Sequence, residues 1–419
     1  MAIRTLRSWI RNALARPARH VRRRPRLDEL EARVNPANPY MVADINTLPT
    51  TEGSNPTNIV DMNGIAYFVA TDPVHGAELW KSDGTAAGTV MVKDILPGLD
   101  GSEISQLTVV NGTLYFQARG EETFPAGGLW KSDGTAAGTV KIFGGGMAFE
   151  KLTAVNNTLF FRNWTAATGT ELWKSDGTTA GTMLVKDIYS GTSGSNPDNL
   201  TAFNGALYFS ASDLTHTDAL WKSDGTAAGT VLVKDIDIAT GSALTNVNGT
   251  LFIATGELWK SDGTTAGTVL VKDIRPGLND SNPTALTNVN GTLFFTANDG
   301  TTGQEVWKSD GTEPGTVLVK DIRSGSSSPN AKYLTNVNGT LFFRADDGTV
   351  GEELWKSDGS AAGTVLVKDI RAGSTGSSAQ SLTAMNGTVY FRANDGVHGL
   401  ELWKSDGTAA GTVMVKELR

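Results

Sequence analysis

Three histidines have the residue type and spacing of possible metal ligands. His75, His216 and His398 each stand five residues before a tryptophan, and the chain contains no cysteine. Imidazole nitrogens bind zinc, but all ligands must lie about 2 Å from the same ion. The three histidines belong to the first, fourth and eighth of eight sequence repeats, and the fourth would lie roughly opposite the other two in a ring. The spacing therefore argues against a shared zinc site.

Three arginines occupy one equivalent position in their repeats and have the chemistry to bind an acidic group. Arg162, Arg344 and Arg392 lie at the end of the second expected strand of the third, seventh and eighth repeats. A guanidinium group holds a carboxylate well through paired hydrogen bonds. Because these repeats are spread over the chain, separate, solvated ion pairs are favoured over one shared anion site.

Acidic turns recur in the sixth, seventh and eighth repeats as Asp-Gly-x-x-Gly-x-Glu, for example from Asp347 to Glu353. Oxygen-rich loops can hold calcium, but each turn supplies few carboxylates and lacks the dense Asp spacing of known calcium loops. No Ser-His-Asp order or phosphate-binding glycine loop stands out. The sequence thus predicts no cofactor, leaves calcium open, and favours a protein that is not an enzyme.

The elements that must position these side chains come from a repeated unit marked by Trp-Lys-Ser-Asp-Gly, which occurs eight times. Successive tryptophans lie 50, 43, 48, 38, 48, 48 and 48 residues apart, a period typical of solenoids, propellers and repeat arrays. A large ring in each unit can fill the space between neighbouring units. The expected repeat core therefore contains Trp80, Trp130, Trp173, Trp221, Trp259, Trp307, Trp355 and Trp403.

One unit is expected to form four antiparallel strands, here called a, b, c and d. In the seventh unit these are Tyr333–Val337, Thr340–Ala345, Glu352–Ser357 and Thr364–Ile370. The Asn338-Gly339 pair between a and b favours a two-residue hairpin, and the Asp of Ser-Asp-Gly is expected to form the c–d turn. Three hairpins followed by one longer crossover fit a propeller blade. The sequence predicts an all-β, eight-bladed β-propeller over residues 40–419.

Two segments of the chain match the pattern of strand d, and either could complete the last blade of this propeller. Tyr40–Ile45 matches the strand d pattern before the first full unit, and Val413–Leu418 matches it at the end of the chain. In many propellers the first strand completes the last blade. The sequence leaves open which copy does so here.

A binding face is expected where the units differ from one another. In an up-and-down blade the b–c turns and d–a crossovers share one end, and in this chain that end varies while the other is nearly uniform. The loop 121–127 lengthens one b–c turn, 162–169 adds Trp164 to another, and 254–256 is shortened. Loops on a rigid scaffold commonly carry recognition. The candidate ligand face therefore contains Trp164, His75, His216, His398, Arg162, Arg344 and Arg392.

Residues 1–39 differ in charge from the rest of the chain. The net charge is −8; residues 1–38 carry ten Arg against three acidic residues, or +7, which leaves −15 for the remainder. An acidic body argues against nucleic-acid binding, and no apolar run is long enough to span a membrane. The basic leader is expected to be partly helical or disordered. Its segment 22–37 resembles the leader of many large bacterial surface or exported proteins.

The whole repeat region resembles a known family. Glu-Leu-Trp-Lys-Ser-Asp-Gly-Thr stands intact at Glu78, Glu171, Glu257 and Glu401, and it is similar to the bacterial ELWxxDGT repeat family. The resemblance implies an exported or surface-associated repeat protein and brings no functional residues with it. We therefore expect an extracellular or cell-surface, monomeric, noncatalytic module that binds a protein or a glycan. A propeller enzyme acting on sugars or lactones at the channel mouth is the alternative.

Overall fold

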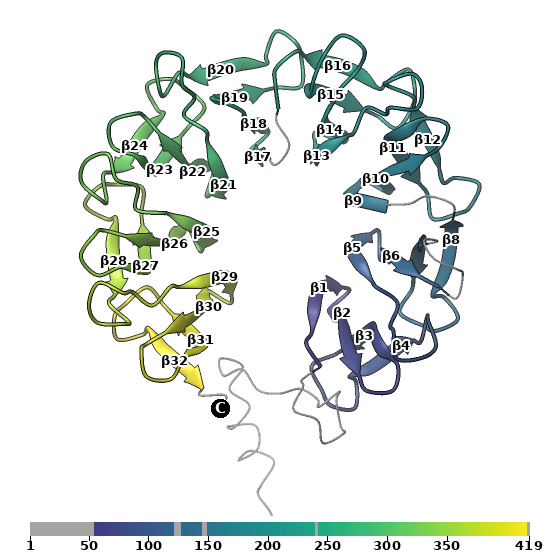
Figure 1. The fold of residues 1–419 in the computed structure, drawn as a ribbon, viewed down its shortest axis with the longest axis horizontal. Helices are drawn as coiled ribbons and strands as arrows, with labels where there is room; N and C mark the ends of the chain where they lie inside the picture. The colour runs from purple at the N-terminus through teal and green to yellow at the C-terminus, as the bar shows by residue number, and fades with distance from the viewer. Residues whose placement is uncertain (1–53, 121–126, 145–148, 239–241, 417–419) are drawn as a thin grey trace, which may run out of the picture. The chain divides into compact units, whose positions relative to one another are not determined.

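The computed structural model describes residues 54–120, 127–144, 149–238 and 242–416. These residues form eight four-stranded antiparallel sheets arranged as the blades of a β-propeller (Figure 1). The predicted all-β, eight-bladed fold is confirmed. The described residues contain no helix, and so none that could cross a membrane. The leader, residues 1–39, and the strand d copy at Tyr40–Ile45 lie outside the described residues.

Each blade consists of four consecutive strands, a to d, with strand a nearest the centre and strand d outermost. The strands of blades 1 to 4 are β1 (Thr57–Met62), β2 (Ile65–Asp72), β3 (Gly76–Ser82), β4 (Val90–Lys93), β5 (Ser105–Val110), β6 (Thr113–Arg119), β7 (Gly127–Ser132), β8 (Val140–Gly144), β9 (Phe149–Val155), β10 (Thr158–Thr165), β11 (Gly169–Ser175), β12 (Met183–Lys186), β13 (Asp198–Phe203), β14 (Ala206–Ala211), β15 (Ala219–Ser223) and β16 (Val231–Lys234). The strands of blades 5 to 8 are β17 (Leu244–Val247), β18 (Thr250–Ala254), β19 (Leu258–Ser261), β20 (Val269–Lys272), β21 (Thr284–Val289), β22 (Thr292–Asn298), β23 (Gln304–Ser309), β24 (Val317–Lys320), β25 (Lys332–Val337), β26 (Thr340–Asp346), β27 (Glu352–Ser357), β28 (Val365–Lys368), β29 (Gln380–Met385), β30 (Thr388–Asn394), β31 (Leu400–Ser405) and β32 (Val413–Lys416).

The C-terminal copy of strand d completes blade 8. Strand β32 pairs antiparallel with β31, with Trp403 opposite Met414. Every blade is therefore built from its own consecutive strands, and no sheet of the described residues combines strands from both ends of the chain.

The turns follow from the residues predicted to form them. Asn338 and Gly339 both have positive φ, 49° and 85°, as a type I′ hairpin requires. In the c–d turn of blade 6, the Asp310 carboxylate accepts hydrogen bonds from the Thr312 N–H at 2.8 Å and from its hydroxyl at 2.7 Å. Equivalent bonds recur in the other blades, so the repeated Asp is a turn former.

The core lies between the blades. In the described residues, seven clusters of buried apolar side chains join each blade to the next, from blades 1 and 2 to blades 7 and 8. No such cluster of described residues joins blades 8 and 1. In blade 8 the face that would meet blade 1 is accordingly more open: Met385 is 45% exposed, whereas its equivalent Val337 in blade 7 is 5% exposed.

The repeated tryptophans occupy these interfaces to different degrees. Five are buried, and Trp355 of blade 7 packs with Val289, Phe294 and Ile322 of blade 6. The Lys320 ammonium lies 5.9 Å from the Trp355 ring centroid and donates to the Thr364 carbonyl at 2.8 Å, which ties blade 6 to blade 7. Trp80, Trp173 and Trp259 are only half-buried. The predicted core role is thus complete for five rings and partial for three.

A buried glutamate of strand c fastens the d–a crossover. Glu353 accepts hydrogen bonds from the Arg371 N–H at 3.0 Å, the Ser377 N–H at 2.8 Å and the Ser377 hydroxyl at 2.6 Å. Because a buried carboxylate is stable only when hydrogen-bonded, these contacts both satisfy the charge and hold the crossover. Blade 6 has Pro329 in the serine position, and one oxygen of its Glu305 has no hydrogen-bond partner among the residues that the structure describes.

Replacing Asn163 by alanine is expected to stabilise the protein. Asn163 is fully buried, and within the part of the chain that the structure describes neither its amide nitrogen nor its amide oxygen has a hydrogen-bond partner. The equivalent residue is alanine in blades 1, 2, 4, 6, 7 and 8, for example Ala345. Because an unpaired buried polar group costs about 1–3 kcal/mol, the Asn163→Ala variant should unfold at higher urea concentration. An Ala345→Asn variant is the reverse control and should unfold earlier; a destabilised Asn163→Ala variant would contradict the expectation.

Candidate functional site

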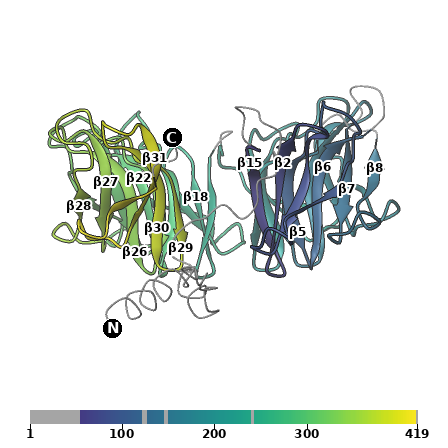
Figure 2. The ribbon, with the colours of Figure 1, turned by 90° about the horizontal axis from the view of Figure 1, so that it is seen from below.

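The b–c turns and the d–a crossovers lie at the same end of the blades, here called the variable end. Thr170 at the b–c turn of blade 3 forms a bridge with Gly194 of the following crossover, and the Asn282 N–H donates to the Gly256 carbonyl at 3.0 Å in blade 5. Seen from the side, the strands run between this end and the end with the a–b and c–d turns (Figure 2). The prediction that the b–c turns and the d–a crossovers share one end of the blades is confirmed.

The three histidines of the variable end each bind an aspartate of their own turn. The imidazole Nδ1 atoms of His75 and His398 lie 2.7 Å from Asp72 and Asp395, and His216 makes the same contact with its own aspartate at 2.9 Å. The hydrogen bonds from the His398 backbone N–H and imidazole lower the pKa of Asp395 to about 2. The histidines therefore order their turns locally, and no group of three metal-ligating side chains was found among the described residues.

The three arginines also have separate partners. Arg162 donates to Glu150, with Nε 2.8 Å from Oε2. Arg344 is buried, pairs with Glu352 at 3.1 Å and packs over the Tyr333 ring at 5.2 Å. In blade 8, Nη2 of the equivalent arginine, Arg392, donates to Gln380 at 3.2 Å. The structure does not bring the three guanidinium groups together.

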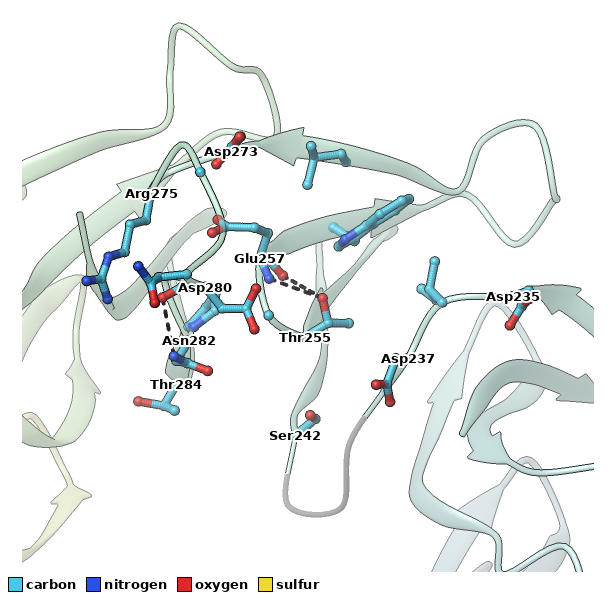
Figure 3. A pocket seen from close by; sticks show the side chains of 17 residues that line it. Asp235, Asp237, Ser242, Thr255, Glu257, Asp273, Arg275, Asp280, Asn282 and Thr284 are labelled. Atoms are coloured by element: carbon cyan, nitrogen blue, oxygen red, sulfur yellow. Dashed lines mark hydrogen bonds between the residues drawn. The ribbon is translucent and has the colours of Figure 1, made fainter. Parts of the chain in front are cut away.

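A hollow with a volume of about 750 Å³ adjoins blade 5 at the variable end. It forms where the b–c turn is shortest, at Thr255 and Gly256, between the crossover that leads into blade 5 and the crossover that leaves it (Figure 3). A side chain at position 256 would have to displace the Asp280 carboxyl group, 2.6 Å from an added Cβ. The half-buried Trp259 also lines the hollow. The hollow thus coincides with the short b–c hairpin of blade 5, in which Ile253 already pairs with Trp259.

The lining of this hollow is acidic. Asp235, Asp237, Asp273 and Asp280 line it, and Arg275 is the one cationic side chain among the lining residues. The fifth carboxylate, Glu257, is already used by the fold, because it accepts hydrogen bonds from the crossover after its blade, as Glu353 does in blade 7. An uncompensated cluster of carboxylates in a concave surface raises the local concentration of cations. The hollow therefore favours a positively charged group.

The variable end also carries the most exposed apolar side chains. Leu99 and Leu278 lie in equivalent d–a crossovers and are 72% and fully exposed, and Leu278 stands between two residues that line the large hollow. Val74, Leu214 and Val397 in the b–c turns are each more than half exposed. These side chains stand in blades 1, 4, 5 and 8, so the variable end carries exposed apolar residues in several of its turns and crossovers.

The sequence pointed to the variable end but did not indicate the blade 5 hollow. Trp164 lines a smaller hollow of about 220 Å³ together with Arg162. The acidic residues around the larger one were not singled out, although the step of 38 residues between Trp221 and Trp259 was the signal. A shortened loop removes side chains, and the space it leaves is visible only when the neighbouring crossovers are placed.

Comparisons with known proteins give similar folds and no relative by sequence. No family model and no curated protein matches the chain. Similar solved structures include the computationally designed Ika8 protein, 16% identical, with a TM-score of 0.49, covering 86% of this chain and 99% of that chain. They also include the β-propeller domain of the trilobed protease from Pyrococcus furiosus, 10% identical, with a TM-score of 0.43, covering 86% and 97%. At these values the likenesses say nothing about what the present protein binds or catalyses.

Proposed function

We propose that this protein is a noncatalytic binding module, secreted or displayed on the cell surface, that holds a protein partner at its variable end. The observation that carries the proposal is that the most exposed apolar side chains, such as Leu99 and Leu278, lie in the turns and crossovers of that end. Apolar anchors surrounded by polar residues are typical of protein interfaces. The placement outside the cytoplasm is supported by the leader resemblance; a full-length product in the cytoplasmic fraction would contradict it.

The acidic hollow favours a partner that carries a positive charge. Leu278 stands at its rim, so an apolar contact and a pocket lined by Asp273 and Asp280 lie side by side. A lysine or arginine of the partner that enters the hollow would pair with these carboxylates. The partner is therefore expected to present a basic side chain next to an apolar patch, and its association rate should fall as salt concentration rises.

Substitutions at the two ends of the blades test this proposal. The immobilised protein is exposed to an envelope extract of the producing cells, and the retained proteins are compared between variants. Leu99→Ser combined with Leu278→Ser should lose the partner, because truncating an anchor weakens binding by roughly tenfold or more. Val90→Ser combined with Met183→Ser removes half-exposed apolar residues at the beginning of strand d, away from that end, and should retain it. Equal retention by both double variants would refute the assignment.

A further inference from the structure

We propose that the smaller hollow at the variable end, in the groove between blades 3 and 4, binds one uncharged sugar ring stacked on Trp164. Its volume is about 220 Å³, and it is lined by Glu150, Arg162, Trp164, Thr170 and Asn196. Sites for drug-sized ligands occupy about 300 Å³ or more. The hollow is therefore suited to a single ring, such as the terminal unit of a glycan.

Strand pairing places the lining side chains on one face of blade 3. Arg162 lies opposite Glu150 on β9, and Trp164 lies opposite Thr170 on β11. Phe160, two residues before Arg162 on the same face, packs in the cluster shared with blade 4, so this face is turned toward blade 4. Asn196 comes from the crossover between the two blades, and its N–H donates to the Thr170 carbonyl at 3.0 Å. The hollow is thus held by hydrogen-bonded strands.

The charges in the hollow compensate one another. Both Nε and Nη2 of Arg162 donate to the same oxygen of Glu150. A neighbouring ion pair, Lys151 with Asp198 at 2.8 Å, joins blade 3 to blade 4. A cation or an anion would have to compete with a partner already in place. The site therefore favours a ligand that is polar but carries no charge.

The remaining polar atoms match hydroxyl groups. Within the described residues, Nη1 of Arg162 and the second oxygen of Glu150 take part in no hydrogen bond, and Thr170 and Asn196 add a hydroxyl and an amide. A hydroxyl group both donates and accepts, so it can use this mixture of partners. Trp164 is 38% exposed, and its ring offers an apolar surface to the C–H face of a pyranose.

Blade 3 is distinct from the two other blades with an arginine in this position. In blade 7 the arginine, Arg344, is covered by Tyr333 and buried. In blade 8, Asn394 stands where blade 3 has Trp164. The combination of an exposed indole with a neutralised arginine therefore occurs in one of the three blades, which is the pattern of a specialised site rather than of a repeated core feature.

Saturation-transfer difference NMR on the full chain tests this inference. The neutral ligands are methyl β-D-glucopyranoside, methyl α-D-mannopyranoside and methyl N-acetyl-β-D-glucosaminide, and at least one should receive saturation at its ring C–H protons. Trp164→Ala should weaken its binding roughly tenfold, and Trp164→Phe should weaken it less because a ring remains. Leu214→Ser, an exposed residue of the next b–c turn, is the control and should bind as the wild type does.

Three results would overturn the inference. They are no transfer to any of the three neutral ligands, transfer that is unchanged in Trp164→Ala, or tighter binding of glucosamine or glucuronate than of the neutral sugars. Because Trp164 lies at the surface, its variants should melt as the wild type does, so loss of binding is not loss of folding. The site shares no residue with the Leu99 and Leu278 surface, and the two proposals therefore succeed or fail separately.

Discussion

Replacing Glu305 with glutamine should stabilise the protein at neutral pH, by roughly 2 kcal/mol. Glu305 is fully buried. Its Oε1 accepts the Ile322 and Arg323 N–H groups at 3.1 and 3.2 Å, whereas Oε2 has no hydrogen-bond partner among the described residues. Burial, with a contribution from the nearby Asp321 carboxylate, raises the pKa of Glu305 to about 8. Glutamine keeps the accepting oxygen and removes the ionisable group.

The pH dependence gives the sign of this effect. The folded-state pKa of about 8 lies above the value of 4.5 for an unperturbed glutamate, so the folded protein holds this proton more tightly than the unfolded chain. The stability contributed by protonation is complete below pH 4.5 and is lost as pH rises through 8, at about 1.4 kcal/mol per pH unit. Urea unfolding of both proteins from pH 5 to 9 should show the difference between them growing with pH.

Two further variants control for this result. Pro329→Ser restores the serine found in blades 3 and 7, whose N–H and hydroxyl both donate to the glutamate there, and should reduce the pH dependence. Glu353→Gln replaces a carboxylate whose two oxygens both accept hydrogen bonds, and should destabilise. Parallel stability curves for the wild type and Glu305→Gln across pH would show that Glu305 does not titrate in this range.

Replacing Trp355 with alanine is expected to lower the free energy of unfolding by about 3–5 kcal/mol. The ring is 5% exposed and fills the interface between blades 6 and 7. Its removal leaves a cavity between two sheets and deprives the Lys320 ammonium of the ring that it covers. Urea unfolding followed by circular dichroism measures the change.

Trp259→Ala is the matched comparison for Trp355→Ala. Trp259 occupies the same position in blade 5 but is half-buried at the acidic hollow, so its truncation should cost less than half as much. Equal losses for the two variants would mean that burial of the ring does not determine its contribution.

The periodic part of the structure was predictable because the same local rules act eight times. Strand c of blade 7, Glu352–Ser357, has the predicted bounds, and the Asn-Gly and Ser-Asp-Gly turns form the expected hairpins. Strand d was predicted as 364–370 but spans Val365–Lys368. The Thr364 hydroxyl instead bonds the Ser360 carbonyl at 2.7 Å, and the Ile370 N–H lies beyond the strand, next to the crossover. Side-chain hydrogen bonds of this kind compete with strand pairing.

The site was less predictable because it depends on departures from the repeat. The histidines were noticed for their shared spacing, yet each serves its own turn, as His75 does with Asp72. The acidic hollow arises where residues are absent and two crossovers, containing Asp237 and Asp280, come close to one opening. Spacing within one unit cannot reveal a contact between two crossovers.

Each blade consists of four consecutive strands, and this affects how a gene for such a protein can evolve. Recombination within the repeated DNA can add or delete one unit without separating any strand from its hydrogen-bonded partners, because each sheet is encoded in one continuous segment. Several joints between units use similar apolar residues and the same lysine–tryptophan contact, as Lys320 and Lys368 make with Trp355 and Trp403, so a duplicated unit can fit beside its parent. Blade number can therefore change without breaking a sheet, and point mutations in the b–c turns and d–a crossovers leave the strand pairing of each blade in place.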